Sequence, residues 1–161
     1  MQADIFLAGR RYDEAIKQYQ KAIELDPNLH LTHYFLGRAY EAKGMYDQAV
    51  EEYLKSSALG GMPPETVKKV KEVYTKSGWK PYVQLNLDQQ LSQSNRRPLP
   101  PFVIAGFYAR LDRKDEAIKW LEKGYEERDF RIRLLNVAFE YDSLRSDPKF
   151  KELVRRMGLP E

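Results

Sequence analysis

Apolar and polar side chains alternate along the 161-residue chain with the spacing of amphipathic helices. The clearest stretch holds two apolar stripes: Phe35, Leu36, Ala39 and Tyr40, then Tyr46, Ala49, Val50 and Tyr53. Gly44 lies between them, where a helix can end on a residue that tolerates positive φ. Over the whole chain the pattern predicts helices near residues 2–9, 12–25, 29–43, 46–59, 63–77, 80–94, 99–111, 114–128, 131–139 and 147–157.

The stripes repeat with a fixed period. Several series of positions keep a spacing of 34 residues: Tyr40, Tyr74 and Tyr108; Gly44, Gly78 and Asp112; Ala15, Ala49, Val83 and Ala117; and Leu36, Val70 and Ile104. A period of about 34 is typical of one kind of helical repeat, and 161 residues hold a little under five such units. The frame predicts that Gly37 and Ala49 lie where two helices cross closely, and that Gly78 and Asp112 end helices as Gly44 does.

The second unit carries the most complete motif. It reads His33-x2-Leu36-Gly37-x2-Tyr40, followed by Gly44, Tyr46, Ala49 and Tyr53. This motif resembles the tetratricopeptide repeat (TPR) family, except that His33 replaces the usual tryptophan. The resemblance covers roughly residues 1–130. It implies an all-α fold, a right-handed superhelix (α-solenoid) of antiparallel helix pairs.

We expect a single domain over residues 1–161, made of units that follow the repeat frame. These are a truncated unit one (1–27), unit two (28–61), a divergent unit three (62–97), unit four (98–130) and a C-terminal helical cap (131–161). Unit three diverges because Lys71 and Val83 replace smaller residues, and we expect wider helix spacing there or a lysine that snorkels outward. Because the first helix is clipped, we expect a fragment of a longer protein. The run Ser146-Asp147-Pro148-x-Phe150 after Leu144-Arg145, together with the segment Trp120–Arg128, resembles C-terminal TPR segments of multidomain bacterial regulators.

Composition excludes several function classes. The chain has no cysteine and only two histidines, which excludes disulfide frameworks, thiolate metal sites and cysteine nucleophiles. The net charge is +3, with basic and acidic residues interleaved, so nucleic-acid binding is disfavoured. No stretch approaches the roughly 20 apolar residues of a membrane span, and no signal peptide is recognisable, which favours the cytoplasm.

Candidate catalytic and metal sites are weak. His30 and His33 have a spacing that can share a metal ion, but no third ligand lies nearby and His33 falls on a core-facing position. Adjacent carboxylates such as Glu51 and Glu52 point about 100° apart on a helix and are typical of a solvated surface. Gly60 and Gly61 precede Met-Pro-Pro rather than the Lys-Ser/Thr of a phosphate loop. We therefore expect no enzyme activity, no cofactor and no metal.

The TPR resemblance implies a concave groove, lined by the first helix of each pair, that receives a peptide or a partner helix. Residues carried over from the family frame are Leu31, Tyr34, Arg38 and Glu41 from unit two, Lys68, Glu72 and Thr75 from unit three, and Phe102, Gly106 and Ala109 from unit four. Arg38 and Lys68 are the only nearby cations, and Tyr34 and Glu72 stand where the clamp of chaperone-binding TPR domains has a basic or amide side chain, so we expect no such clamp. It favours an extended peptide or amphipathic helix with apolar anchors.

The sequence therefore predicts a non-catalytic protein-interaction module, with a regulatory or scaffolding role in a larger bacterial protein. A self-associating structural spacer is the first alternative, with the truncated N-terminal end around Ile5, Phe6, Leu7 and Ile16 as the contact surface. Weak nucleic-acid binding through Arg96 and Arg97 and the C-terminal basic pair is the second alternative.

Overall fold

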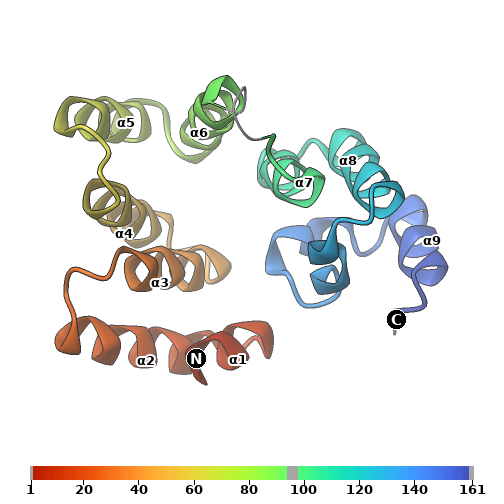
Figure 1. Ribbon diagram of the computed structural model, residues 1–161, viewed down its shortest axis with the longest axis horizontal. Coiled ribbons are helices and arrows are strands. Elements are labelled where there is room, and N and C mark those ends of the chain that lie inside the picture. The colour runs from red at the N-terminus through yellow and green to blue at the C-terminus, as the bar shows by residue number, and fades with distance from the viewer. Residues whose placement is uncertain (1, 94–97, 160–161) are drawn as a thin grey trace. The chain divides into compact units, whose positions relative to one another are not determined.

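The computed structural model describes residues 2–93 and 98–159, and within these ranges all regular secondary structure is helical (Figure 1). The α-helices are α1 (Gln2–Ala8), α2 (Tyr12–Leu25), α3 (His30–Ala42), α4 (Tyr46–Leu59), α5 (Pro64–Ser77), α6 (Trp79–Gln93), α7 (Pro101–Arg110), α8 (Lys114–Glu126) and α9 (Pro148–Arg156). Two 3-10 helices, η1 (Phe130–Leu134) and η2 (Phe139–Leu144), lie between α8 and α9. The predicted all-α fold of consecutive TPR-type helix pairs is confirmed.

The chain divides into two compact units, Met1–Trp79 and Lys80–Glu161. The division falls within residues 62–97, the repeat in which Lys71 and Val83 stand at the positions of Gly37 and Ala49. Lys71 is exposed on α5, as expected for a lysine whose stem snorkels outward. The larger side chains thus occur in the repeat within which the chain divides into its two units.

In the first unit, α2, α3, α4 and α5 follow one another as a row of layers, from red to yellow-green in Figure 1. The closest crossing lies between α3 and α4, because Gly37 brings the α3 backbone against Ala49 and the ring of Tyr53. A Cβ atom at position 37 would lie 2.8 Å from two carbon atoms of that ring. Ala15 and Ala49, 34 residues apart, are both completely buried, so small residues mark the helix crossings as the repeat predicts.

The turns between paired helices share a residue with positive φ. Positive φ angles occur at four positions spaced by 34 residues: Arg10 (59°), Gly44 (74°), Gly78 (82°) and Asp112 (63°). At three of these turns the next N–H closes on the preceding helix: Arg11 to Phe6, Met45 to Tyr40 and Arg113 to Tyr108. The prediction for Gly44, Gly78 and Asp112 is confirmed. Arg10 also has a positive φ, although its residue type does not signal it.

Aspartates at the start of the second helix of a pair reach forward along the chain. Their partners are Lys43 for Asp13, Tyr74 for Asp47 and Lys149 for Asp115. Asp13 and Asp47 are 34 residues apart and Asp115 follows Asp47 by two such periods, but the donors differ in type and spacing. The repeat therefore places an acceptor at a constant position, and the following segment supplies whatever donor it holds there.

The second unit pairs α7 with α8 and continues into η1, η2 and α9. Its core gathers Leu121 from α8, Leu135, Tyr141 and Leu144 from the segment after α8, and Phe150 and Leu153 from α9. The predicted helix start at residues 147–148 is confirmed, because the Asp147 side chain accepts the N–H of Lys149 and Pro148 lies in the first turn.

The prediction of one short helix over residues 131–139 is wrong. The chain instead forms the two 3-10 helices with a turn between them, in which Val137 and Ala138 donate to the carbonyl of Leu134. A continuous helix would keep one residue face toward the core. The turn allows Leu135 and Tyr141, which lie on either side of it, both to be buried.

Among the residues that the structure describes, no helix is both long and apolar enough to cross a lipid bilayer.

Candidate functional site

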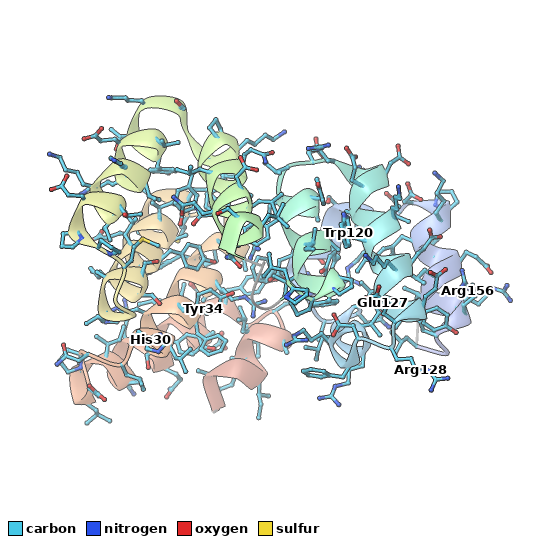
Figure 2. The ribbon with its side chains drawn as sticks, turned by 45° about the horizontal axis from the view of Figure 1, so that its top comes forward. His30, Tyr34, Trp120, Glu127, Arg128 and Arg156 are labelled. Carbon is cyan, nitrogen blue, oxygen red and sulfur yellow. The ribbon has the colours of Figure 1, made fainter. Side chains whose placement is uncertain are left out.

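The predicted groove residues of unit two lie on one stripe of α3. Leu31 and Tyr34 are exposed, and Arg38 follows one turn later and is half-buried. The opposite side of the helix is buried, with Thr32, Leu36 and the other core residues facing α2 and α4. Figure 2 labels Tyr34 together with His30, one turn earlier on the same helix. The amphipathic pattern of α3 therefore places an aliphatic, an aromatic and a cationic side chain in a row at the surface.

The Tyr34 ring is supported by other aromatic rings. Its centroid lies 5.5 Å from that of Phe35 in an edge-to-face contact and 5.7 Å from that of Tyr53. Phe35 in turn stacks on the fully buried Tyr19, with centroids 6.1 Å apart. An exposed tyrosine that rests on two half-buried aromatic rings loses little conformational freedom when it contacts a partner.

Glu41, also assigned to the groove by the family frame, has a structural partner in the same unit. It is buried, with 7% of its surface exposed, and its Oε2 accepts the Tyr53 hydroxyl at 2.6 Å. This bond holds the ring of Tyr53, which contacts Tyr34. Glu41 therefore acts on the exposed stripe through Tyr53.

On α5 the predicted positions Lys68, Glu72 and Thr75 are all exposed. Thr75 donates its hydroxyl to the backbone carbonyl of Lys71, and Glu72 lies 3.8 Å from Lys76. Lys68 has no ion pair with any residue that the structure describes. This face thus presents one lysine whose charge is not paired.

In the second unit, the predicted positions on α7 face the chain's own C-terminal segment. Gly106 and Ala109 are buried, and a Cβ atom at Gly106 would lie 3.4 Å from the Tyr141 hydroxyl. That hydroxyl donates to the carbonyl of Phe102 at 2.6 Å, and the two rings lie 5.1 Å apart. Tyr141 is a structural residue that the repeat frame leaves without a role, because it lies beyond the last repeat.

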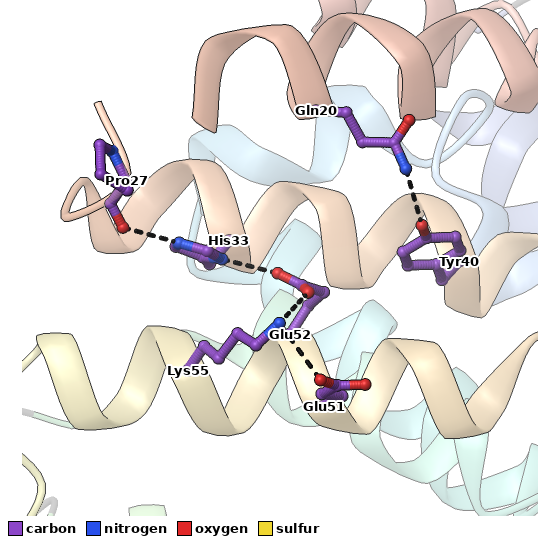
Figure 3. A network of polar contacts seen from close by, with 7 residues as sticks. All are labelled: Gln20, Pro27, His33, Tyr40, Glu51, Glu52 and Lys55. Carbon is purple, nitrogen blue, oxygen red and sulfur yellow. Dashed lines mark hydrogen bonds and ion pairs between the residues drawn. The ribbon is translucent and has the colours of Figure 1, made fainter. Parts of the chain in front are cut away.

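A buried polar network ties α3 to α4 in the first unit (Figure 3). His33 Nε2 lies 3.0 Å from the carbonyl oxygen of Pro27, and Nδ1 lies 2.6 Å from Oε2 of Glu52. A carbonyl can only accept, so Nε2 carries a hydrogen, and a further proton lies between Nδ1 and Oε2. The other Glu52 oxygen accepts from Lys55 at 2.9 Å, and this hydrogen bond raises the pKa of the Lys55 ammonium.

This network confirms that His33 faces the core, and it assigns a structural role to Glu52. The sequence interpretation had placed Glu52 with its neighbour Glu51 on the solvated surface, which is wrong for Glu52 because it is buried. The signal lay in the repeat frame, since Glu52 follows the core position Ala49 by three residues, about one turn, and His33 replaces a core tryptophan. No cluster of three potential metal ligands occurs among residues 2–93 and 98–159.

Tyr74 also has a defined polar partner. Its hydroxyl donates to Asp47 at 2.6 Å and links α5 to α4. Burial of the phenol, together with the nearby carboxylate, raises the pKa of Tyr74 to about 12. The neutral phenol is therefore the form that holds these two helices together.

Most of the residues expected to mediate self-association or nucleic-acid binding are buried or contact other residues of the chain. Leu7 and Ile16 are buried, and the Arg11 guanidinium covers the half-buried Phe6 ring, so Ile5 is the exposed member of that set. Arg96 and Arg97 lie outside the described residues. In the C-terminal basic pair, Arg155 makes two hydrogen bonds to Glu152 and Arg156 lies over the ring of Tyr125.

Comparison with known proteins identifies the N-terminal part of the chain. A family model described as TPR repeat matches residues 3–44, and one described as tetratricopeptide repeat matches residues 32–61. No curated protein and no solved structure matches the chain. The matched residues form α1 to α4, which hold the tight α3–α4 crossing, the recurrent turns and the Tyr34 stripe. Residues 3–61 are therefore similar to tetratricopeptide repeats.

Proposed function

We propose that the chain is a non-catalytic protein-binding module whose first unit takes a peptide or a partner helix along α3 and α5. Repeats of this family generally mediate protein–protein interaction. The observation that carries the proposal is the exposed Tyr34 ring, which is held in place by Phe35 and Tyr53. Rigid, partly exposed aromatic residues are the usual anchors of protein interfaces.

The chemistry of the stripe indicates the kind of ligand. Leu31 and Tyr34 offer apolar contact, while Arg38, Lys68 and Glu72 offer charges of both signs. Mixed charges favour a segment that carries apolar anchors between polar residues. We propose an extended peptide or an amphipathic helix as the ligand, and not a C-terminal carboxylate alone.

The test begins with peptides selected by phage display on the folded chain. Fluorescence anisotropy then measures their binding to the double variant Tyr34→Ala/Arg38→Ala. We expect affinity to fall by about tenfold or more, because central aromatic and arginine residues dominate interface energies. Unchanged affinity in a variant with wild-type circular dichroism would reject the groove.

Tyr46→Ala is the matched control. Tyr46 and Tyr34 have the same exposed fraction, 41%. Tyr46, however, is the first residue of α4 and stacks on Trp79, with ring centroids 4.6 Å apart. Its loss should leave peptide affinity unchanged. Equal losses in both variants would indicate a general effect on stability or surface aromatic content.

We further propose a regulatory or scaffolding role within a larger bacterial protein, supported by the resemblance of Trp120–Arg128 to TPR segments of multidomain regulators. The reading frame that encodes the chain tests this role directly. Light scattering over a concentration series tests the self-associating spacer, and heparin retention at low salt tests the nucleic-acid alternative.

A further inference from the structure

An exposed apolar and cationic surface lies in the second unit, outside the predicted groove. We call it the Phe130 patch, and it consists of Phe130, Arg131, Arg133, Leu134 and Val137. Phe130 is 61% exposed, and Leu134 and Val137 are 43% and 42% exposed. These are large exposed fractions for apolar side chains that follow one another so closely in the chain.

The geometry of η1 explains why these side chains face outward. A 3-10 helix has three residues per turn, so its side chains form columns at intervals of three. Ile132 and Leu135 make the inner column, which packs on the core of the second unit. The two outer columns then hold Phe130 with Arg133, and Arg131 with Leu134.

Hydrogen bonds to the buried Asp129 carboxylate fix the start of η1, which carries the patch. The carboxylate of Asp129 has only 4% of its side-chain surface exposed, and it accepts the backbone N–H groups of Phe102 at 3.2 Å and of Arg131 at 3.1 Å. The same carboxylate accepts from the Arg131 guanidinium at 3.2 Å. This guanidinium lies over the Phe130 ring, 4.4 Å from its centroid, and that of Arg133 lies 5.6 Å from it. The ring is therefore positioned before any partner arrives, which lowers the entropic cost of docking.

Charge defines the partner that fits. Asp129 neutralises Arg131, whereas Arg133 and the neighbouring Arg128 make no ion pair with any residue in the described part of the chain. Arg128 is exposed, and Figure 2 shows its side chain extending away from the ribbon. The patch and the adjacent Arg128 thus combine apolar anchors with two guanidinium groups that make no ion pair in the described part of the chain.

We propose that the Phe130 patch docks an acidic peptide segment in which aspartates or glutamates alternate with large apolar residues. The apolar residues cover Phe130, Leu134 and Val137, and the carboxylates pair with Arg128 and Arg133. A nucleic acid fits less well, because the exposed apolar side chains of Leu134 and Val137 offer it no hydrogen bond. The proposal is independent of the groove in the first unit.

The probe is a fluorescein-labelled synthetic peptide of about 15 residues with glutamate alternating with leucine and phenylalanine, titrated with the full chain by anisotropy. The comparison peptide has lysine at every glutamate position. We expect the acidic peptide to bind, more weakly as salt rises, and the lysine peptide not to bind. Absence of binding by the acidic peptide, or equal binding of the two, would overturn the proposal.

Variants locate the binding. Phe130→Ala and Arg133→Glu should each weaken the acidic peptide by about tenfold or more, while Lys17→Glu, which makes the same charge change in the first unit, should not. Phe130→Leu and Arg133→Gln, compared at matched circular dichroism, keep the test valid if a harsher variant unfolds. Undiminished binding in all four patch variants would overturn the proposal.

Other occupants give different results. Tighter binding of a single-stranded oligouridine that is lost with Phe130→Ala would reassign the patch to nucleic acid. A dimer in light scattering that Phe130→Ala dissolves would reassign it to a second copy of the chain. Weaker acidic-peptide binding in Tyr34→Ala would move the site to the first unit, so failure of this proposal can be distinguished from failure of the groove.

Discussion

Replacing Gly37 by alanine tests whether the α3–α4 crossing depends on the absence of a side chain. The new Cβ would lie 2.8 Å from Cδ1 and Cε1 of Tyr53 and 3.1 Å from the carbonyl oxygen of Ala49. Tyr53 cannot swing away freely, because its hydroxyl donates to Glu41 at 2.6 Å and its ring contacts Tyr34. The clash must therefore be relieved by separating the helices or by moving a hydrogen-bonded ring.

The expected magnitude combines two opposing effects. Overpacking a well-packed site costs about 1–3 kcal/mol, and alanine gains roughly 1 kcal/mol over glycine inside a helix. If the Tyr53 ring moves, weakening its bond to the buried Glu41 carboxylate adds about 1 kcal/mol or more. We expect a net loss of about 1–3 kcal/mol in the unfolding free energy of the first unit.

Gly106→Ala is the matched control in the second unit. Gly106 is also buried within a helix, but its added Cβ would meet the Tyr141 hydroxyl at 3.4 Å and Nη1 of Arg110 at 4.0 Å, both ordinary contact distances. The helix-propensity gain should dominate there, so we expect no loss and up to about 1 kcal/mol of added stability.

Urea unfolding followed by tryptophan fluorescence can read each unit separately. Trp79 lies in the first unit and Trp120 in the second, so Trp120→Phe and Trp79→Phe backgrounds isolate the respective transitions. Gly37→Ala should lower the urea midpoint of the first unit in the Trp120→Phe background, which keeps Trp79. In a Tyr53→Phe chain the ring is no longer bonded to Glu41, so the loss of stability caused by Gly37→Ala should be smaller. The steric argument would be refuted if Gly37→Ala were as stable as its parent. It would also be refuted if Gly37→Ala and Gly106→Ala changed the stability of their parents by the same amount.

Two further predictions concern the polar links of the first unit. Glu52→Ala should lower the unfolding free energy of the first unit by about 1–3 kcal/mol, because buried His33 Nδ1 loses its partner. Urea unfolding measures this loss. A loss no larger than that of the exposed control Glu51→Ala would contradict the prediction. Tyr74 has a folded pKa raised from 10.0 to about 12, so its contribution to stability is complete below pH 10 and is lost as pH rises toward 12. Tyr74→Phe should remove one phenol that titrates above pH 10 from the alkaline absorbance curve. An unchanged titration curve would contradict the assignment.

The repeat frame allowed the helices and their turns to be predicted closely, because period and turn chemistry are local properties. Gly44, Gly78 and Asp112 mark the helix ends by residue type, and the frame also predicts that Leu31 and Tyr34 lie on the groove face of α3. Both are exposed there. Where the frame stops, after residue 130, a short apolar pattern could not distinguish one helix from two 3-10 turns.

Contacts between residues far apart in the chain could not be predicted in this way. Nothing in the sequence around Gly106 indicates its contact with Tyr141, which lies 35 residues later in the chain. Likewise, buried Glu52 has the same residue type as its exposed neighbour Glu51, so the sequence does not distinguish them. Hydrophobic period and turn residues determine where helices begin, end and face. Packing of the helices decides which polar groups pair in the interior and which helix faces are covered by other parts of the chain. The physical reason is that a buried polar group without a partner is costly, and that a close helix crossing admits only small side chains.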